Sequence, residues 1–283
     1  MEIINKIIEF FKSLFNKKDD EVAVAEILTP TVVVEEEEKI IENKEENIMS
    51  EINESAAIFE TSTKKQYKGL AVALDPGHAI TTPGKKSPYS LKKVTSPELP
   101  FEEWEFNREI TYLVKNMLKE FGVEVFVTTT AEMDGDTDLG LSKRATRAND
   151  FIKKCGKKGL FLSIHSDADG MGNTWTKARG WSCYTTKGQN NSDRFADCLY
   201  DAAEEILPNM GMKIRTDKKD GDRDWEEDFT VIYKANMPAV LTENCFYTNI
   251  DDVKFLISDE GKEAIARIHV NGILKFAEQF YKM

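Results

Sequence analysis

Three side chains with catalytic chemistry stand where apolar runs of the chain end. Residues 69–75 read GLAVALD and lead through Pro and Gly to His78, the run 159–165 ends on His165, and a third run reaches Glu243. Two imidazoles, one carboxylate and one water form the ligand set of a four-coordinate catalytic zinc site. Because zinc lowers the pKa of bound water toward ~7, these residue types predict metal-assisted hydrolysis.

A second carboxylate is expected from the start of the segment 103–121. Apolar residues recur there at helical spacing, and Glu102, Glu103 and Glu105 stand at its beginning. One carboxylate would complete the zinc site, and the other would be available as a general base. The spacing alone does not choose among the three glutamates.

Apolar runs and helical patterns alternate along the rest of the chain. The expected strands are 69–75, 123–128, 159–165, 180–186, 229–235 and 238–244, and the expected helices are 103–121, 142–154, one capped by Ser192, and 259–281. Strand runs without polar–apolar alternation are typical of strands covered on both faces. We therefore predict an α/β fold, a mostly parallel twisted sheet with helices on both faces. Ligands bind beyond the carboxyl ends of such strands, where the histidines and Glu243 fall.

The first 66 residues differ from the rest in charge and pattern. Residues 1–18 predict an amphipathic helix that lies on a membrane surface or docks on protein. Residues 19–60 hold 14 acidic residues and two lysines, and so carry the whole net charge of −12. Because like charges repel and extend a chain, 19–66 is expected to be an acidic linker, disordered or partly helical. The catalytic domain is predicted at 67–283.

Composition excludes several classes of function. Outside residues 19–60 the acidic and basic residues balance, so no basic surface for a nucleic acid is expected. No apolar run approaches the ~20 residues of a membrane span. Lys6, Glu9 and Lys12 interrupt any signal-peptide core. The four cysteines show neither zinc-finger nor disulfide spacing and are expected to be free, mostly buried thiols: Cys155, Cys183, Cys198 and Cys245.

Two further features are interpreted as structural. His269 stands between Ile265 and Ile273 on an apolar helical face, which predicts packing rather than metal binding. The acid-rich stretch 217–228 does not fit the ligand order of an EF-hand calcium loop. It is expected to be a solvated loop bordering the cleft, in which Trp225 stacks on a sugar or packs under the loop.

Five ordered motifs carry a family resemblance. They read LDPGHAITTPGKKSP, EEWEFNREI, LSKRATRAND, FLSIHSDADG and MPAVLTENCFYTN. Together they resemble the zinc-dependent N-acetylmuramoyl-L-alanine amidases, the peptidoglycan amidase 3 family, over about residues 68–281. The versions found in bacteriophages and prophages are the most similar. The resemblance implies Zn²⁺ as the cofactor and peptidoglycan as the substrate.

The resemblance also assigns roles to single residues. It implies three zinc ligands and one catalytic glutamate: His78, Glu103, His165 and Glu243. Glu103 is selected over its neighbours because the family's ligand glutamate is followed, after three residues, by Asn, here Asn107. Arg144 and Asn149 match a family helix and are interpreted as pinning that helix to the sheet.

The chain departs from the family pattern at two places. Ala79-Ile80 stands where the family often has Gly-Gly, and Asp167 stands where it usually has Asn. Both departures bear on substrate preference more than on metal binding.

The implied reaction is zinc-dependent hydrolysis of the amide between N-acetylmuramic acid and L-alanine, with Glu243 carrying the proton. A zinc peptidase that cuts the stem peptide and a non-catalytic wall-binding module are the alternatives, and the lack of H-E-x-x-H disfavours a zincin. The expected place of action is the bacterial cell wall, reached from the cytoplasm on release because no signal peptide is recognised. A monomer is expected, with residues 1–18 contacting a membrane or a protein.

Overall fold

The computed structural model describes residues 65–88, 100–135, 137–219 and 221–283. They belong to one compact unit, Thr61–Met283. The amphipathic helix expected at 1–18 and nearly all of the linker expected at 19–66 lie outside the described residues. Within the described part of the chain, no helix is long and apolar enough to cross a lipid bilayer.

A mostly parallel sheet forms the centre of this unit, as the sequence predicts. Its described strands are β1 Leu70–Pro76, β2 Glu124–Val127, β3 Lys158–Asp167, β4 Ser182–Thr185, β5 Trp225–Glu226 and β6 Ala239–Phe246. Their order is β2-β1-β3-β6-β4-β5. The strands β2, β1, β3 and β6 run parallel, whereas β4 is antiparallel to β6. The carboxyl ends of β1, β3 and β6 therefore lie at one rim.

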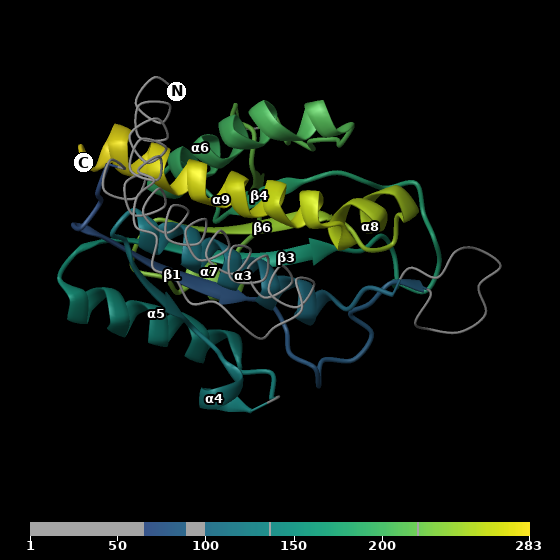
Figure 1. Cartoon of the computed structure of the whole chain (residues 1–283), viewed down its shortest axis with the longest axis horizontal. Coiled ribbons are helices and arrows are strands. Elements are labelled where there is room, and N and C mark those ends of the chain that lie inside the picture. The colour runs from purple at the N-terminus through teal and green to yellow at the C-terminus, as the bar shows by residue number, and fades with distance from the viewer. Residues whose placement is uncertain (1–64, 89–99, 136, 220) are drawn as a thin grey trace, which may run out of the picture. The chain divides into compact units, whose positions relative to one another are not determined.

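Helices cover both faces of the sheet (Figure 1). Those described are α3 Glu103–Glu120, α4 Ala131–Asp134, α5 Leu141–Cys155, α6 Asn191–Ile206, α7 Thr230–Tyr233, α8 Ile250–Ile257 and α9 Asp259–Phe280, with the 3₁₀ turn η2 Leu207–Met210. α3, α6 and α9 pack on one face and α5 and α7 on the other. The cap of α6 differs from the prediction, because Asn190 rather than Ser192 caps it. The Ser192 hydroxyl instead accepts a hydrogen bond from the Ala239 amide of β6.

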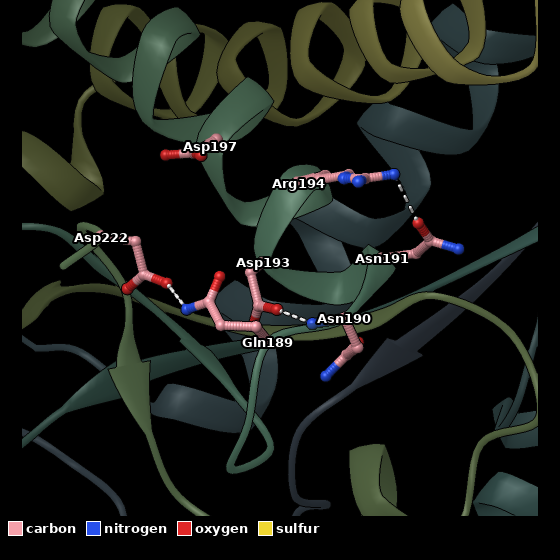
Figure 2. A pocket seen from close by; sticks show the side chains of 7 residues that line it. All are labelled: Gln189, Asn190, Asn191, Asp193, Arg194, Asp197 and Asp222. Atoms are coloured by element: carbon pink, nitrogen blue, oxygen red, sulfur yellow. Dashed lines mark hydrogen bonds between the residues drawn. The ribbon is translucent and has the colours of Figure 1, made fainter. Parts of the chain in front are cut away.

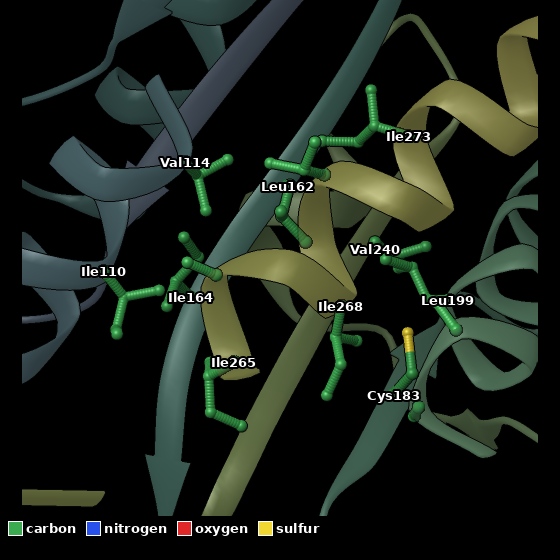
Figure 3. Close-up of a cluster of buried hydrophobic side chains, with 14 of the residues drawn as sticks. Ile110, Val114, Leu162, Ile164, Cys183, Leu199, Val240, Ile265, Ile268 and Ile273 are labelled. Atoms are coloured by element: carbon green, nitrogen blue, oxygen red, sulfur yellow. The ribbon is translucent and has the colours of Figure 1, made fainter. Parts of the chain in front are cut away.

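The strands are apolar on both faces because both faces are buried. In β1, Leu70, Val72 and Leu74 pack into the larger cluster under α3 and α9, and Ala73 packs into the smaller cluster under α5. Figure 3 shows side chains of α3 and α9 meeting over β3 and β6 in the larger cluster. This two-sided burial fixes the register of each strand, and with it the direction of the polar side chains at the strand ends.

The strand expected at 229–235 is wrong, because Thr230–Tyr233 form the single-turn helix α7. Val231 and Ile232 both pack into the smaller cluster, against residues such as Phe161 of β3. Adjacent side chains of a strand point to opposite faces, so a strand could not bury both on one side. The apolar run is thus explained equally well by a helical turn, which the tertiary contacts select.

The segment 217–228 is also less solvated than expected. Trp225–Glu226 form the edge strand β5, which pairs with β4, and Asp224 just before it is buried. The Trp225 indole packs against Arg215, whose guanidinium lies 5.0 Å from the ring centroid. This favours the packed alternative for Trp225 over the sugar-stacking one.

Candidate metal centre and active site

His78, Glu103 and His165 come together at the rim, with one ligand atom of each within 4.8 Å of the others. Nδ1 of His165 lies 3.2 Å from Oε1 of Glu103, and Nε2 of His78 lies 3.5 Å from the same oxygen. The two imidazole rings are nearly perpendicular, with centroids 5.0 Å apart. The three residues expected to be ligands are thus neighbours in space.

The turn that follows β1 sets the direction of the His78 side chain. His78 itself has the left-handed backbone conformation, with φ of 64°, which costs a non-glycine residue free energy. Gly77 still belongs to the ladder, since its amide donates to the Ile164 carbonyl at 2.9 Å. The sharp turn is therefore made at His78 and not at the glycine before it.

Gly77 is required because a side chain at this position would clash with the His165 ring. A Cβ at this position would lie 2.2 Å from Cε1 of His165, closer than real Cβ atoms approach. The absence of a side chain at Gly77 therefore lets the His165 ring lie against the backbone of β1. The glycine and the histidine belong to paired strands, so the close approach is built into the sheet.

Glu103 is held in place by its position in α3 and by contacts with neighbouring residues. It begins α3 and is 1% exposed, and the Ser166 amide donates to its Oε1 at 3.2 Å. Asn107, one helical turn on, donates to the Gly77 carbonyl at 3.1 Å and so ties α3 to the turn after β1. Among the neighbouring glutamates, Glu102 lies 3.6 Å from Lys86 and Glu105 is exposed. Of these three glutamates, Glu103 is the one that lies against both histidines.

The group as a whole fits a metal ion. Oε2 of Glu103 is buried and has no hydrogen-bond partner. A buried carboxylate oxygen without a partner is costly, and a cation beside it would remove that cost. Two imidazole nitrogens and one carboxylate oxygen are the donor set of catalytic zinc sites with an open fourth position.

The electrostatics of the three residues suit ligation. Burial lowers the pKa of His78 to about 4, so its imidazole is neutral near pH 7 and a ring nitrogen can bind a metal. Burial opposes ionisation of Glu103, but the hydrogen bond with His165, together with weaker electrostatic contributions, holds the pKa of Glu103 below the usual value. A neutral histidine and an ionised carboxylate are the forms that metals bind.

Glu243 lies directly beside His165. The two residues are register partners on β6 and β3, so their side chains emerge on the same face of the sheet. Oε2 of Glu243 is buried and lacks a hydrogen-bond partner. Burial, with repulsion from Asp167 and Glu103, raises the pKa of Glu243 well above its usual value. A raised pKa favours the protonated carboxyl, which is the form that can give a proton to a leaving group.

Asp167, at the departure from the family pattern, is held by a residue that sequence reasoning missed. Arg215 binds Asp167 with Nη1 3.1 Å from Oδ2, and its guanidinium carbon lies 5.0 Å from the ring centroid of Trp225 and 4.8 Å from that of Phe246. No motif singles out Arg215, because it comes from the irregular segment after η2. Its contact with Asp167 appears only in three dimensions.

Arg144 joins α5 to the end of β1, as expected. It is buried, and its Nη1 lies 3.1 Å from Asp75 Oδ1 and 2.6 Å from the Pro76 carbonyl oxygen. Asn149 instead holds the segment after α7, because it bonds to the Lys234 carbonyl and the Asn236 amide. A cavity of about 390 Å³ adjoins the candidate metal site, and its lining includes His78, Thr82, His165 and residues at the start of α5.

The remaining predicted features lie apart from this site. His269 is buried in α9 with Nε2 3.1 Å from the Thr242 hydroxyl, which agrees with a packing role. All four cysteines are free, and three of them are buried, as expected.

Residues 72–275 match the family of N-acetylmuramoyl-L-alanine amidases. This chain belongs to that family. Among curated relatives it is 29% identical over 205 residues to an endolysin of Bacillus phage SPP1, covering 71% of this chain and 64% of the endolysin. It is 27% identical over 209 residues to the amidase CwlM of Bacillus licheniformis, covering 73% and 68%. The chain thus spans about two thirds of the length of these relatives.

Solved structures of amidases share the fold. The N-acetylmuramoyl-L-alanine amidase of Clostridium difficile 630 superposes with a TM-score of 0.60 at 23% identity, covering 76% of this chain and all of that one. The amidase Ami1 of Mycobacterium smegmatis gives a TM-score of 0.57 at 23% identity, with coverages of 75% and 98%. The predicted α/β fold with a mostly parallel sheet is therefore confirmed.

Proposed function

We propose that this protein is a zinc-dependent N-acetylmuramoyl-L-alanine amidase that hydrolyses peptidoglycan. The observation that carries the proposal is a pair of unpartnered buried carboxylate oxygens at one rim, on Glu103 and on Glu243. One stands in the His78–Glu103–His165 group, and the other stands beside His165. Membership of the amidase family supplies the reaction class.

In this proposal His78, Glu103 and His165 are the ligands, and Zn²⁺ is the ion. Two imidazoles and one carboxylate favour zinc over the harder Mg²⁺ and Ca²⁺. A bound zinc ion would supply Lewis-acid polarisation of the amide carbonyl and a lower pKa for water. Asn107 and Ser166 would keep Glu103 in place, since one ties α3 to the Gly77 carbonyl and the other donates to the carboxylate.

Glu243 would act as the general base and then as the general acid. Its carboxylate takes the proton of the attacking water as the water oxygen bonds to the carbonyl carbon. It then gives that proton to the alanine nitrogen as the carbon–nitrogen bond breaks. The raised pKa of Glu243 favours the second transfer, and a cation nearby would lower that pKa enough to permit the first.

The place of action follows from the substrate. Peptidoglycan is insoluble, and a chain resembling a phage endolysin acts on it at the bacterial cell wall. We propose that 67–283, preceded by a few residues that bond to it, is the catalytic unit and acts as a monomer. Residues 1–18 and the acidic residues after them would hold this unit near the wall or membrane.

Mass spectrometry of purified sacculi after digestion tests the proposed reaction. The amidase releases stem peptides with a free L-alanine amino terminus and leaves intact lactyl groups on the glycan. Cleavage between two stem amino acids would instead identify a peptidase. Unchanged sacculi, with the protein bound to them and the metal present, would identify a wall-binding module.

A further inference from the structure

A second cluster of carboxylates stands apart from the metal centre. Asp193 in the first turn of α6, and Asp222 and Asp224 just before β5, each place one carboxylate oxygen within 4.8 Å of the others. Asp193 and Asp222 line a cavity of about 320 Å³ together with Gln189, whose amide lies beside both of them (Figure 2). Two distant segments of sequence therefore bring three acids together.

Each of the three carboxylates keeps one buried oxygen without a hydrogen-bond partner, its Oδ1. Asp193 is 4% exposed and Asp224 is 1% exposed. The opposite oxygens are occupied, because the Asn190 amide donates to Asp193, the Gln189 side chain to Asp222 and the Thr185 hydroxyl to Asp224. Buried carboxylate oxygens without partners are rare and costly, and a cation bound between these three oxygens would remove that cost.

Protein cations do not neutralise the cluster. None of the ion pairs formed by the described residues includes Asp193, Asp222 or Asp224. Arg223 stands between two of these acids in sequence, but its guanidinium binds the α6 side chains Asp197, Asp201 and Glu204. Arg194 lines the same cavity, but its guanidinium donates to the Asn191 side chain (Figure 2).

We propose that Asp193, Asp222 and Asp224 form a binding site for a hard divalent cation, with Ca²⁺ as the expected occupant. Carboxylate and amide oxygens bind Ca²⁺, Mg²⁺ and Mn²⁺ in preference to softer metals. Ca²⁺ accepts six to eight oxygens in flexible geometry, and the open cavity leaves room for waters to complete that number. This site differs in chemistry from the histidine-containing centre at the rim.

The competing occupant is a proton. Burial, with repulsion from Asp222 and Asp193, raises the pKa of Asp224 to about 7. Either a bound cation or a retained proton can therefore reduce the repulsion among the three carboxylates. The two cases predict opposite effects of replacing Asp224 with an amide. Asp224→Asn would abolish cation binding, whereas it would replace a protonated carboxyl without a loss of stability.

A bound cation would tie the segment before β5 to α6. Trp225 follows Asp224 directly and carries the stacked guanidinium of Arg215. Arg215 in turn binds Asp167, two residues beyond His165. The cation would thereby hold the Arg215–Asp167 ion pair in place at the catalytic rim. This connection between the two sites is the same whichever metal binds at the rim.

Terbium luminescence on the full-length protein is a direct test. Tb³⁺ replaces Ca²⁺ at oxygen sites, and Trp225 next to Asp224 is placed to sensitise its emission. We expect saturable emission that Ca²⁺ displaces, and a rise in Tm of about 5 °C at Ca²⁺ concentrations ~100-fold above the Kd. Parallel titrations with Mg²⁺ and Mn²⁺ identify which hard cation gives the largest shift.

Three variants locate the site. Asp222→Asn and Asp224→Asn should lose the terbium emission and the cation-dependent Tm shift, whereas Glu227→Gln, an exposed acid of the same segment, should keep both. Emission unchanged in both Asn variants would place the ion elsewhere and overturn the proposal. So would a wild-type Tm that none of the three cations shifts, or an Asp224→Asn protein that matches wild-type stability with and without cation.

Discussion

Oε1 of Glu103 lies 3.2 Å from Nδ1 of His165, although 62 residues separate the two in sequence. One residue begins the helix α3, and the other stands near the carboxyl end of β3. The contact is the shortest link in the group of three expected metal ligands. Removal of one member of this group therefore tests the assignment directly.

Metal analysis should find about one zinc per chain in protein purified without chelator. Glu103→Ala removes a carboxylate ligand, so we expect the zinc content to fall at least ~10-fold and activity to fall with it. Chelation of the wild type should likewise abolish hydrolysis, and added zinc should restore it.

Glu105→Ala is the matched control for Glu103→Ala. Its side chain is exposed two residues further along the same helix, so zinc content should stay at the wild-type level. Loss of zinc in Glu105→Ala with retention in Glu103→Ala would contradict the register of the motif.

Glu243→Gln should separate chemistry from metal binding. The amide keeps the size of the side chain but cannot accept the water proton, so kcat should fall at least ~100-fold while zinc content is unchanged. Inductively coupled plasma analysis and peptide-release kinetics on the same preparation measure both quantities. Turnover within a factor of two of wild type would remove Glu243 from the proposed mechanism.

Gly77→Ala should weaken the proposed metal site by a steric clash, without any change of charge. The new Cβ would lie 2.2 Å from the His165 ring, which must therefore move away from its position in the sheet. We expect a loss of about 1–3 kcal/mol in the free energy of unfolding and weaker zinc binding. Gly140→Ala is the control, because nothing lies within 4 Å of its added Cβ. Equal zinc affinity in the two variants would refute the steric argument.

His269 should make the domain sensitive to mild acid. Burial lowers its pKa to about 3, whereas the unfolded-state value is near 6.5, so protonation favours the unfolded chain. Its contribution is complete above pH 6.5 and is lost as pH falls toward 3. At pH 5.5 the loss is about 1.4 kcal/mol.

His269→Gln, which does not titrate, is the comparison for that measurement. Urea unfolding at pH 7.5 and 5.5 should show the stability difference between the wild type and this variant shrinking by that amount at the lower pH. A difference that is the same at both pH values would show that His269 is protonated in the folded state or does not titrate.

A chain starting at Thr61 should fold and cleave soluble muropeptide at close to the full-length rate. Lys65, Gln66 and Tyr67 bond to α9 and to the end of α3, so these residues must stay. On intact sacculi the truncated chain should be slower, because residues before Thr61 would raise its effective concentration at the wall. Several-fold faster cleavage of soluble substrate would instead identify an inhibitory tail.

Much of the catalytic rim could be predicted from the sequence, because strand ends are visible in it. The runs before His78, His165 and Glu243 are apolar without alternation, and parallel strands deliver their carboxyl ends to one edge. The choice of Glu103 over Glu102 and Glu105 could not come from spacing, since all three stand within one helical turn. Burial separates them, since Glu103 is buried and Glu105 is exposed, and burial is a property of the packed fold.

Other features depended on contacts that no local pattern records. α7 was misread because Val231 and Ile232 favour strands, yet both pack on one side of the sheet. The left-handed backbone conformation falls on His78 rather than on the glycine before it, and the role of Gly77 depends on the ring of His165 in another strand. Arg215 became visible only when β5 and the end of β3 were placed together.

The entry point of the catalytic unit lies at the opposite end of β1 from its chemistry. Lys65 and Tyr67 both bond to Glu278 near the end of α9, so the two ends of the unit meet there. Seven residues of β1, about 23 Å at 3.3 Å each, separate this meeting point from the turn that carries His78. Any segment joined at Lys65 therefore enters the unit at the end of β1 that is remote from His78, and the rim with His78, His165 and Glu243 lies at the other end.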